Sequence, residues 1–122
     1  MVRDSDNAFP EKNRLIAASE YKKVFTKAVR STDKYFTVLA TAGSSKEPRL
    51  GLAISKKNTR LATDRNRLKR IIRESFRHNK QIVSGLDLVV MAKFGAAKVD
   101  NRKLFESLST HWKNLSRKFH GS

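Results

Sequence analysis

The stretch Arg65-Asn66-Arg67-Leu68-Lys69-Arg70-Ile71-Ile72-Arg73-Glu74-Ser75-Phe76-Arg77 repeats its side-chain types with the period of an α-helix. On a helical wheel of about 100° per residue, apolar side chains share one face: Leu61, Leu68, Ile71, Ile72 and Phe76. Basic and amide side chains fill the adjoining arc: Asn66, Arg67, Lys69, Arg70, Arg73 and Arg77, with Arg65 at the seam. We expect a helix over about 59–78, capped by Asn58 or Thr59, that packs on a sheet and displays cations on its other face.

The cationic face carries more charge than a solvated helix needs. Residues 56–77 include nine basic and two acidic residues, a net charge of +7. Four cations follow one another at i,i+4 spacing: Arg65, Lys69, Arg73 and Arg77. Each like-charged pair at this spacing destabilises a helix by about 0.2–0.5 kcal/mol. A solvated surface is the usual explanation of a charge run. Here a polyanion explains the row better, and Arg suits bidentate contact with phosphate.

The whole chain has the same bias. Its 122 residues, enough for one domain, include 27 Lys and Arg against 11 Asp and Glu, a net charge of +16. Such an excess favours a polyanionic partner, with nucleic acid first and an anionic membrane second. No apolar run reaches the roughly 20 residues of a spanning helix, and residues 1–4 lack the layout of a signal peptide. With no cysteine, a reduced cytoplasmic protein is the simplest fit.

Before the basic helix, the chain favours a helix and then strands. Ser19 is a suitable cap for a helix that places Tyr21, Val24, Phe25 and Ala28 on one face. Strands are expected over 35–40 and 50–55, with a shorter one around 28–32, and the composition of residues 43–48 is that of a hairpin turn.

After the basic helix, residues 87–92 form an apolar run typical of a strand buried on both faces. A last helix should begin at Asp100 or Asn101, with an apolar stripe of Leu104, Phe105, Leu108, Trp112, Leu115 and Phe119. The order α-β-β(-β)-α-β-α predicts an α+β or α/β sandwich with one mixed central sheet. We expect a polar arm over 1–13, a single RNA-binding domain over 14–119 and a tail over 120–122.

Together these segments resemble the bacterial ribonuclease P protein component. The resemblance is carried by Arg65–Arg77, by Gly51-Leu52-Ala53-Ile54-Ser55-Lys56-Lys57-Asn58 before it, and by Asp87-Leu88-Val89-Val90-Met91-Ala92-Lys93. Further matches are Ala8-Phe9-Pro10, Arg14-Leu15 and the segment from Tyr21 to Phe25. The resemblance implies a left-handed β-α-β crossover, although about 98% of such connections are right-handed.

The resemblance also implies a function. Such proteins bind a catalytic RNA, and the resemblance implies one protein per RNA. The complex removes the 5′ leader of precursor tRNA by endonucleolytic cleavage. The RNA holds the Mg²⁺ ions, so the protein is expected to have no catalytic residue and no metal ligand. Contacts to the RNA subunit would fall to Arg60, Arg65, Asn66, Arg67, Lys69, Arg70 and Arg73. Contacts to the leader would fall to Tyr21, Phe25, Phe36, Lys56 and Lys57.

Alternatives remain open at the level of residues and of function. Tyr21, Phe25 and Phe36 could stack on bases or could be core, and Trp112 and His111 read as packed structural residues. An independent nuclease is disfavoured because the 11 acidic residues form no cluster and the three histidines are far apart in sequence. The main alternative is a ribosomal or other structured-RNA-binding protein of the same fold. A DNA-binding module ranks lowest, since neither a helix-turn-helix nor a zinc-finger pattern is present.

Overall fold

The computed structural model describes residues 11–15 and 18–120. Residues 1–10 of the predicted arm and 121–122 of the predicted tail lie outside the described residues. The elements, in chain order, are η1 (Glu11–Asn13), α2 (Ala18–Lys27), β1 (Val29–Thr32), β2 (Phe36–Ala42), β3 (Arg49–Ala53), α3 (Ala62–His78), β4 (Leu86–Ala92), η2 (Ala96–Lys98) and α4 (Asn101–His120). This is the predicted order, with the short first strand included.

The four strands form one mixed sheet in the order β1-β2-β4-β3. Strand β4 is central: it pairs antiparallel with β2 and parallel with β3. Almost every residue of β4 is buried, which confirms that its continuous apolar run reflects burial on both faces. The α+β fold with one mixed sheet is therefore confirmed.

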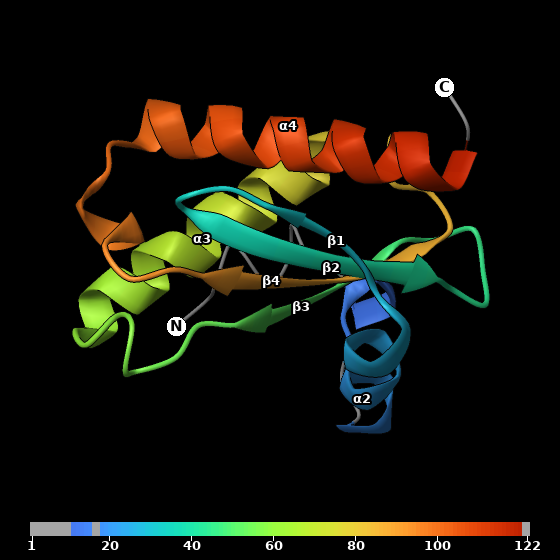
Figure 1. Ribbon diagram of the computed structural model, residues 1–122, viewed down its shortest axis with the longest axis horizontal. Coiled ribbons are helices and arrows are strands. Elements are labelled where there is room, and N and C mark those ends of the chain that lie inside the picture. The colour runs from blue at the N-terminus through green and yellow to red at the C-terminus, as the bar shows by residue number, and fades with distance from the viewer. Residues whose placement is uncertain (1–10, 16–17, 121–122) are drawn as a thin grey trace.

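Helices cover the two faces of the sheet unequally. Alternate residues of β2 and β4, such as Phe36, Val38 and Leu88, join α3 and α4 in the larger core. Leu39 and Val89 point to the opposite face and pack on α2 in a smaller cluster. In Figure 1, α3 and α4 lie on one side of the sheet and α2 projects from the other. One face of the sheet is thus packed along its length, while α2 covers only part of the other.

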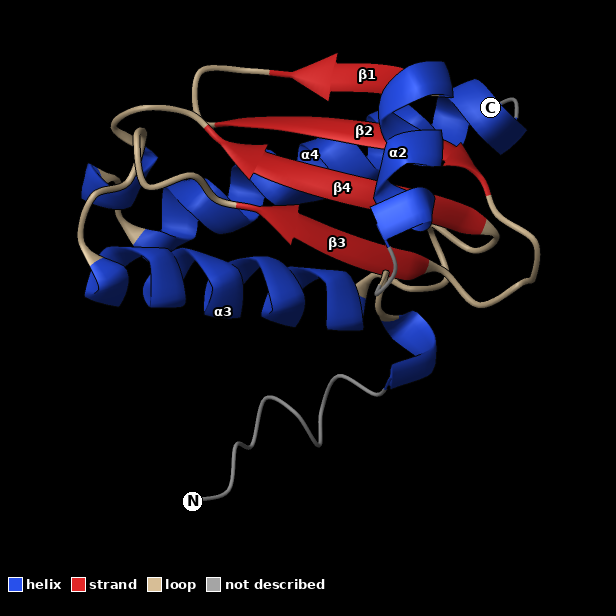
Figure 2. Cartoon of the chain, turned by 90° about the horizontal axis from the view of Figure 1, so that it is seen from below, coloured by secondary structure: helices blue, strands red, loops and turns tan. Residues whose placement is uncertain are grey.

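The connection from β3 through α3 to β4 joins two parallel neighbours. Seen from the α2 side in Figure 2, both strands point to the left and β4 lies above β3. The buried residues of α3 pack with those of α4 in the core on the face of the sheet away from α2. Taken in that order, the crossover is left-handed, as the family resemblance implied and against the general rule.

Two predicted helix starts were wrong. Helix α3 begins at Ala62, and its N-cap is Leu61, which makes no side-chain capping bond. Leu61 therefore does not join the apolar face of the helix and is 61% exposed, whereas Leu68, Ile71, Ile72 and Phe76 are buried as predicted. Helix α2 begins at Ala18, so Ser19 lies within its first turn and not at the cap.

Helix α4 packs against both the sheet and α3. Of its predicted stripe, Leu104, Leu108, Trp112 and Leu115 are buried, while Phe105 and Phe119 are partly buried against the core. The indole of Trp112 donates to the hydroxyl of Ser75 at 2.8 Å and meets the ring of Phe76 edge to face. The predicted core role of Trp112 is confirmed.

His111 is also structural. Its Nδ1 lies 2.7 Å from Oγ of Ser31 on β1, and its Nε2 lies 3.2 Å from Oδ2 of Asp33 without the geometry of a hydrogen bond. Burial lowers the pKa of His111, although the charge of Asp33 opposes the shift. Burial alone would raise the pKa of Asp33, but hydrogen bonds from Ser107 and from two backbone amides lower it overall. This network joins α4 to the β1–β2 hairpin.

Candidate nucleic-acid interface

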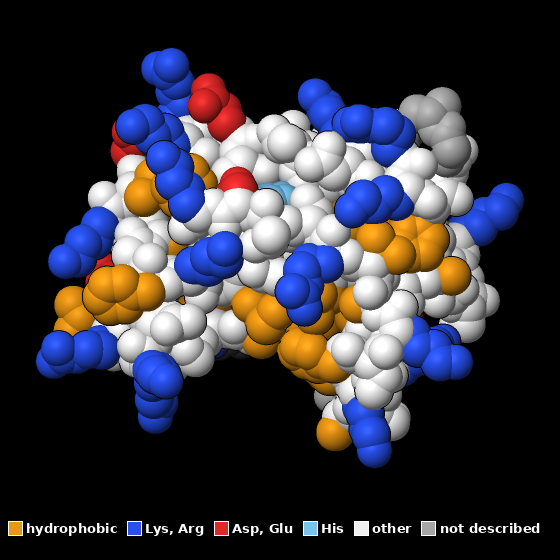
Figure 3. Space-filling view, viewed as in Figure 1, with side chains coloured by type: hydrophobic (Ala, Val, Ile, Leu, Met, Phe, Trp, Pro, Cys, Tyr) orange, Lys and Arg blue, Asp and Glu red, His pale blue; other side chains and the backbone are white. Residues whose placement is uncertain are grey.

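The side of α3 that faces away from the core carries the predicted cations. Arg70 and Asn66 are exposed on this face and Arg60 is exposed just before it, while Arg65, Arg67, Lys69 and Arg73 are half-buried. The apolar residues between them lie in the core, so the helix holds its charges on a rigid support. We call the set Arg60, Arg65, Asn66, Arg67, Lys69, Arg70 and Arg73 the cationic face. Figure 3 shows that Lys and Arg also outnumber Asp and Glu across the side of the molecule seen there.

Two arginines of the cationic face also bind the protein itself. Arg67 donates to the backbone oxygens of Ala97 and Val99 at 2.8 and 2.7 Å and to the side chain of Asn101. Arg65 donates to the backbone oxygens of Thr59 and Arg60. Both arginines therefore fix the loops beside the helix, a role that the sequence pattern did not reveal because backbone acceptors have no sequence signature.

One end of the cation row is neutralised. Glu74 binds His78 at 3.0 Å and Arg77 at 2.6 Å. The hydrogen bond from His78, together with Arg77, lowers the pKa of Glu74. Repulsion is thereby reduced near the C-terminus of α3, and the remaining cations lie toward its N-terminus.

A second candidate surface lies on the opposite face of the sheet. Tyr21 and Phe25 of α2 are one helical turn apart, with Tyr21 half-buried and Phe25 47% exposed. The ring of Tyr21 lies directly on Gly51 of β3, where an added Cβ would come within 2.6–2.8 Å of Cε1, Cζ and Oη. The missing side chain of Gly51 thus makes room for the ring. Glycine within a strand is a known sign of such close approach, but the sequence alone did not pair it with Tyr21.

An ion-pair network holds α2 in this position. Arg49 of β3 binds Asp87 of β4 through both Nε and Nη2, at 3.0 and 2.8 Å, and also binds Glu20 of α2. These hydrogen bonds raise the pKa of Arg49, with Asp87 the main cause. Asp87 is almost fully buried, so its charge needs this partner. Nothing in the sequence pattern predicted the network.

The remaining residues expected at the leader do not all join this surface. Lys56 and Lys57 are exposed beyond the end of β3. The five residues of chain from Gly51 to Lys56 can span at most about 18 Å. Phe36 is fully buried, and it lies in the core between the sheet, α3 and α4. The placement of Phe36 beside Tyr21 was wrong, because Phe36 falls on the other side of the pleat from Leu39. We call Tyr21, Phe25, Lys56 and Lys57 the aromatic–lysine surface.

Within residues 11–15 and 18–120 there is no group of three or more His, Cys, Asp or Glu side chains that could hold a metal ion. No helix in the same part of the chain is long and apolar enough to cross a membrane. What the geometry offers is cations on one rigid helix and, on the α2 side of the sheet, the exposed ring of Phe25 beside the half-buried ring of Tyr21. Lys56 and Lys57 are exposed in the loop that leads from β3 to Arg60.

Comparison with known proteins agrees with this geometry. The family model described as "Ribonuclease P" matches residues 9–116. The ribonuclease P protein component of Methylococcus capsulatus is 46% identical over 114 residues, 93% of this chain and 89% of that protein. The Escherichia coli O157:H7 protein of the same name is 42% identical, over 94% of this chain and 97% of its own.

Solved structures give the same result for the fold. The ribonuclease P protein of Thermotoga maritima matches with a TM-score of 0.75 at 31% identity, over 83% of this chain and 96% of that one. The Staphylococcus aureus protein matches with a TM-score of 0.78 at 26% identity, over 84% and 94%. These matches set aside the ribosomal alternative: the chain belongs to the ribonuclease P protein family and is the protein subunit of this ribonucleoprotein endoribonuclease of tRNA processing.

Proposed function

We propose that the two surfaces divide the RNA between them. The cationic face binds the catalytic RNA of ribonuclease P, and the aromatic–lysine surface binds the 5′ leader of precursor tRNA. The observation that carries the proposal is that α3 turns its apolar side to the core and its arginines outward on a rigid support. Phosphates beside these arginines would relieve their mutual repulsion and gain bidentate hydrogen bonds.

The aromatic–lysine surface suits a single strand. Unpaired bases stack on aromatic rings at about 1–3 kcal/mol per base, largely without regard to sequence. Phe25 and the half-buried ring of Tyr21 supply two such rings, and Lys56 and Lys57 would bind phosphates farther along. Phe36 takes no part, because its ring is enclosed in the core.

In this proposal the protein supplies no catalytic group. The catalytic RNA would hold the Mg²⁺ ions that activate the attacking water, and one protein would serve one RNA. Its part is to hold the leader and the catalytic RNA together, which raises the affinity for substrate. We place this work in the cytoplasm, where precursor tRNA is made.

The direct test is cleavage of a precursor tRNA by the catalytic RNA at low Mg²⁺, with and without the chain. We expect the protein to increase kcat/KM for precursor tRNA. Binding of the catalytic RNA should weaken with salt, each phosphate contact contributing about −0.7 to −0.9 to the log–log slope. Arg70→Ala removes an exposed cation and should flatten that slope by about one such contact. An unchanged cleavage rate, or a slope that Arg70→Ala leaves the same, would contradict the proposal.

A further inference from the structure

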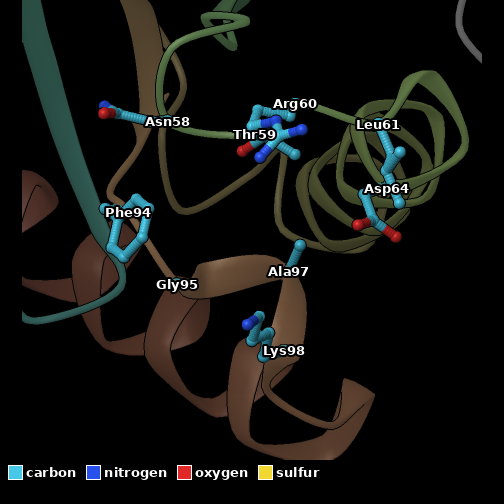
Figure 4. A pocket seen from close by; sticks show the side chains of 9 residues that line it. All are labelled: Asn58, Thr59, Arg60, Leu61, Asp64, Phe94, Gly95, Ala97 and Lys98. Carbon is cyan, nitrogen blue, oxygen red and sulfur yellow. The ribbon is translucent and has the colours of Figure 1, made fainter.

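A hollow of about 350 Å³ lies at the N-terminal end of α3, between the loop that precedes the helix and the turn after β4. It is lined by Asn58, Thr59, Arg60, Leu61, Asp64, Phe94, Gly95, Ala97 and Lys98. Figure 4 shows Phe94 on one side of the space, Leu61 and Asp64 on the other, and Thr59 and Arg60 between them. Its volume is at the lower end of the 300–1,000 Å³ typical of small-molecule sites.

The hollow gathers exposed apolar side chains. Among the described residues three large hydrophobic side chains are exposed, and two of them, Leu61 at 61% and Phe94 at 79%, line this one space. They come from segments 33 positions apart in the chain. The third, Phe25, belongs to the aromatic–lysine surface. Neither Leu61 nor Phe94 supports the core, so core packing does not account for an apolar residue at either position.

Two polar groups in the wall of the hollow lack partners among the described residues. Thr59 is 3% exposed, and its hydroxyl makes no hydrogen bond. The half-buried carboxylate of Asp64 makes no hydrogen bond or ion pair either, in a chain of net charge +16. The dipole of α3 stabilises the negative charge of Asp64 in the first turn of the helix. That stabilisation does not explain why the carboxylate lies in the wall of a hollow. A buried hydroxyl without a partner, such as that of Thr59, calls for a specific explanation, and the carboxylate oxygens of Asp64 are open to solvent and free to accept hydrogen bonds from a ligand.

The surroundings indicate which ligand. Arg60 and Lys98 line the hollow beside the apolar side chains of Leu61 and Phe94, and Arg60 belongs to the cationic face, so the hollow continues the surface proposed for the catalytic RNA. An apolar protein partner would have to leave these cations unpaired. A nucleotide fits both parts: its base stacks on Phe94 beside Leu61, and its phosphates meet the cations.

We propose that this hollow holds one unstacked base of the catalytic RNA, and that Asp64 selects guanine. This inference rests on the proposed function and adds a base-reading site to a helix otherwise expected to contact phosphates. A carboxylate accepts hydrogen bonds and donates none. Guanine has two adjacent donors, N1–H and the N2 amino group, on its Watson–Crick edge. Those donors match the two oxygens of Asp64, whereas the other three bases lack this adjacent pair.

The first test measures binding of the catalytic RNA to the full-length chain at several salt concentrations. Phe94→Ala should weaken binding roughly 5- to 150-fold, the value of one stacked base, and should leave the salt slope unchanged. Phe94→Tyr should restore most of the affinity. Arg60→Ala is the matched control: it should flatten the slope. Because Phe94 is 79% exposed, its replacement should not alter the melting temperature.

The outcomes separate the two proposals. If the wild-type chain does not bind the catalytic RNA, the proposed function fails. If the wild type binds and Phe94→Ala binds equally well, or if Phe94→Ala changes the salt slope, the base site is overturned. A change in sedimentation of the RNA-free chain on Phe94→Ala would show that a second copy covers the hollow, and would also overturn the base site.

The second test needs no catalytic RNA. In a Phe94→Trp chain the new indole should be quenched by guanosine monophosphate more than by the adenosine, cytidine or uridine monophosphates. The buried Trp112 of the wild-type chain gives the background. Asp64→Asn in the same chain should remove the preference for guanosine. Equal quenching by all four nucleotides would overturn the role of Asp64, and no quenching by any of them would overturn the site.

Discussion

Replacement of Gly51 by Ala tests the aromatic–lysine surface without removing any group proposed to touch RNA. The added Cβ would lie 2.6–2.8 Å from three atoms of the Tyr21 ring, whereas carbon atoms pack at about 3.5–4.0 Å. The ring must therefore retreat by roughly 1 Å. Tyr21 lies on a half-exposed helix, so it can move, and we expect little change in melting temperature.

The expected effect is on the leader. A displaced ring should lose about 1 kcal/mol of stacking, the lower end of the value for one base, which is roughly a 5-fold weaker Kd. The assay compares the holoenzyme's affinity for precursor tRNA with its affinity for the same tRNA without a leader. Only the first should weaken. In a Tyr21→Ala background, Gly51→Ala should cost nothing further.

Two results would refute this reasoning. An equal loss for the leaderless tRNA would show that Gly51→Ala disturbs the whole domain. A loss in the Tyr21→Ala background as large as in the wild type would show that Gly51 does not act through Tyr21.

Other predictions concern stability. Arg49→Met leaves the buried carboxylate of Asp87 without its partner and should lower the free energy of unfolding by about 3 kcal/mol in urea titrations; the double change with Asp87→Leu should recover most of it. Arg67→Ala, which removes bonds to the β4–α4 connection, should lower both stability and affinity for the catalytic RNA, whereas Arg70→Ala should lower affinity alone. The lowered pKa of His111 means that the unfolded chain binds a proton at this histidine more readily, so the contribution of His111 to stability should be constant above about pH 6.5 and fall as the pH drops below it. His111→Gln should flatten that pH dependence, and an identical profile would contradict it.

Much of the fold could be predicted because periodicity and burial agree over long segments. The apolar run of β4 and the stripes of α3 and α4 each point to one environment, and the structure places them there. The start of α3 could not be predicted in this way. Thr59 and Asn58 are good caps by type, but Asn58 donates to the backbone of Ala92 and the hydroxyl of Thr59 is buried in the loop. Tertiary contacts decided where the helix begins.

The candidate site was harder to predict than the fold. Helical spacing revealed which face of α3 is cationic, but not that Arg65 and Arg67 would bind neighbouring loops. The leader role of Phe36 came from the family resemblance and not from the strand pattern. Along β2 the apolar Phe36, Val38 and Ala40 alternate with Thr37, Leu39 and Thr41, so the pattern places Phe36 on the face opposite Leu39. Contacts between distant segments, such as Tyr21 with Gly51, leave no periodic signal at all.

The central position of β4 has a consequence for synthesis. Strands β2 and β3 do not pair with each other; each depends on β4, whose residues follow both of them in the chain. A nascent chain cannot complete its sheet until Ala92 has left the ribosome, and pairing over such separations is slow. Until then, helix α2 lacks its contact with Val89, and α3 lacks the core residues that β4 supplies, Leu88, Val90 and Ala92. The ribosome must therefore have made most of the protein before it can bind RNA at either surface, so incomplete chains should not compete with finished ones for the catalytic RNA.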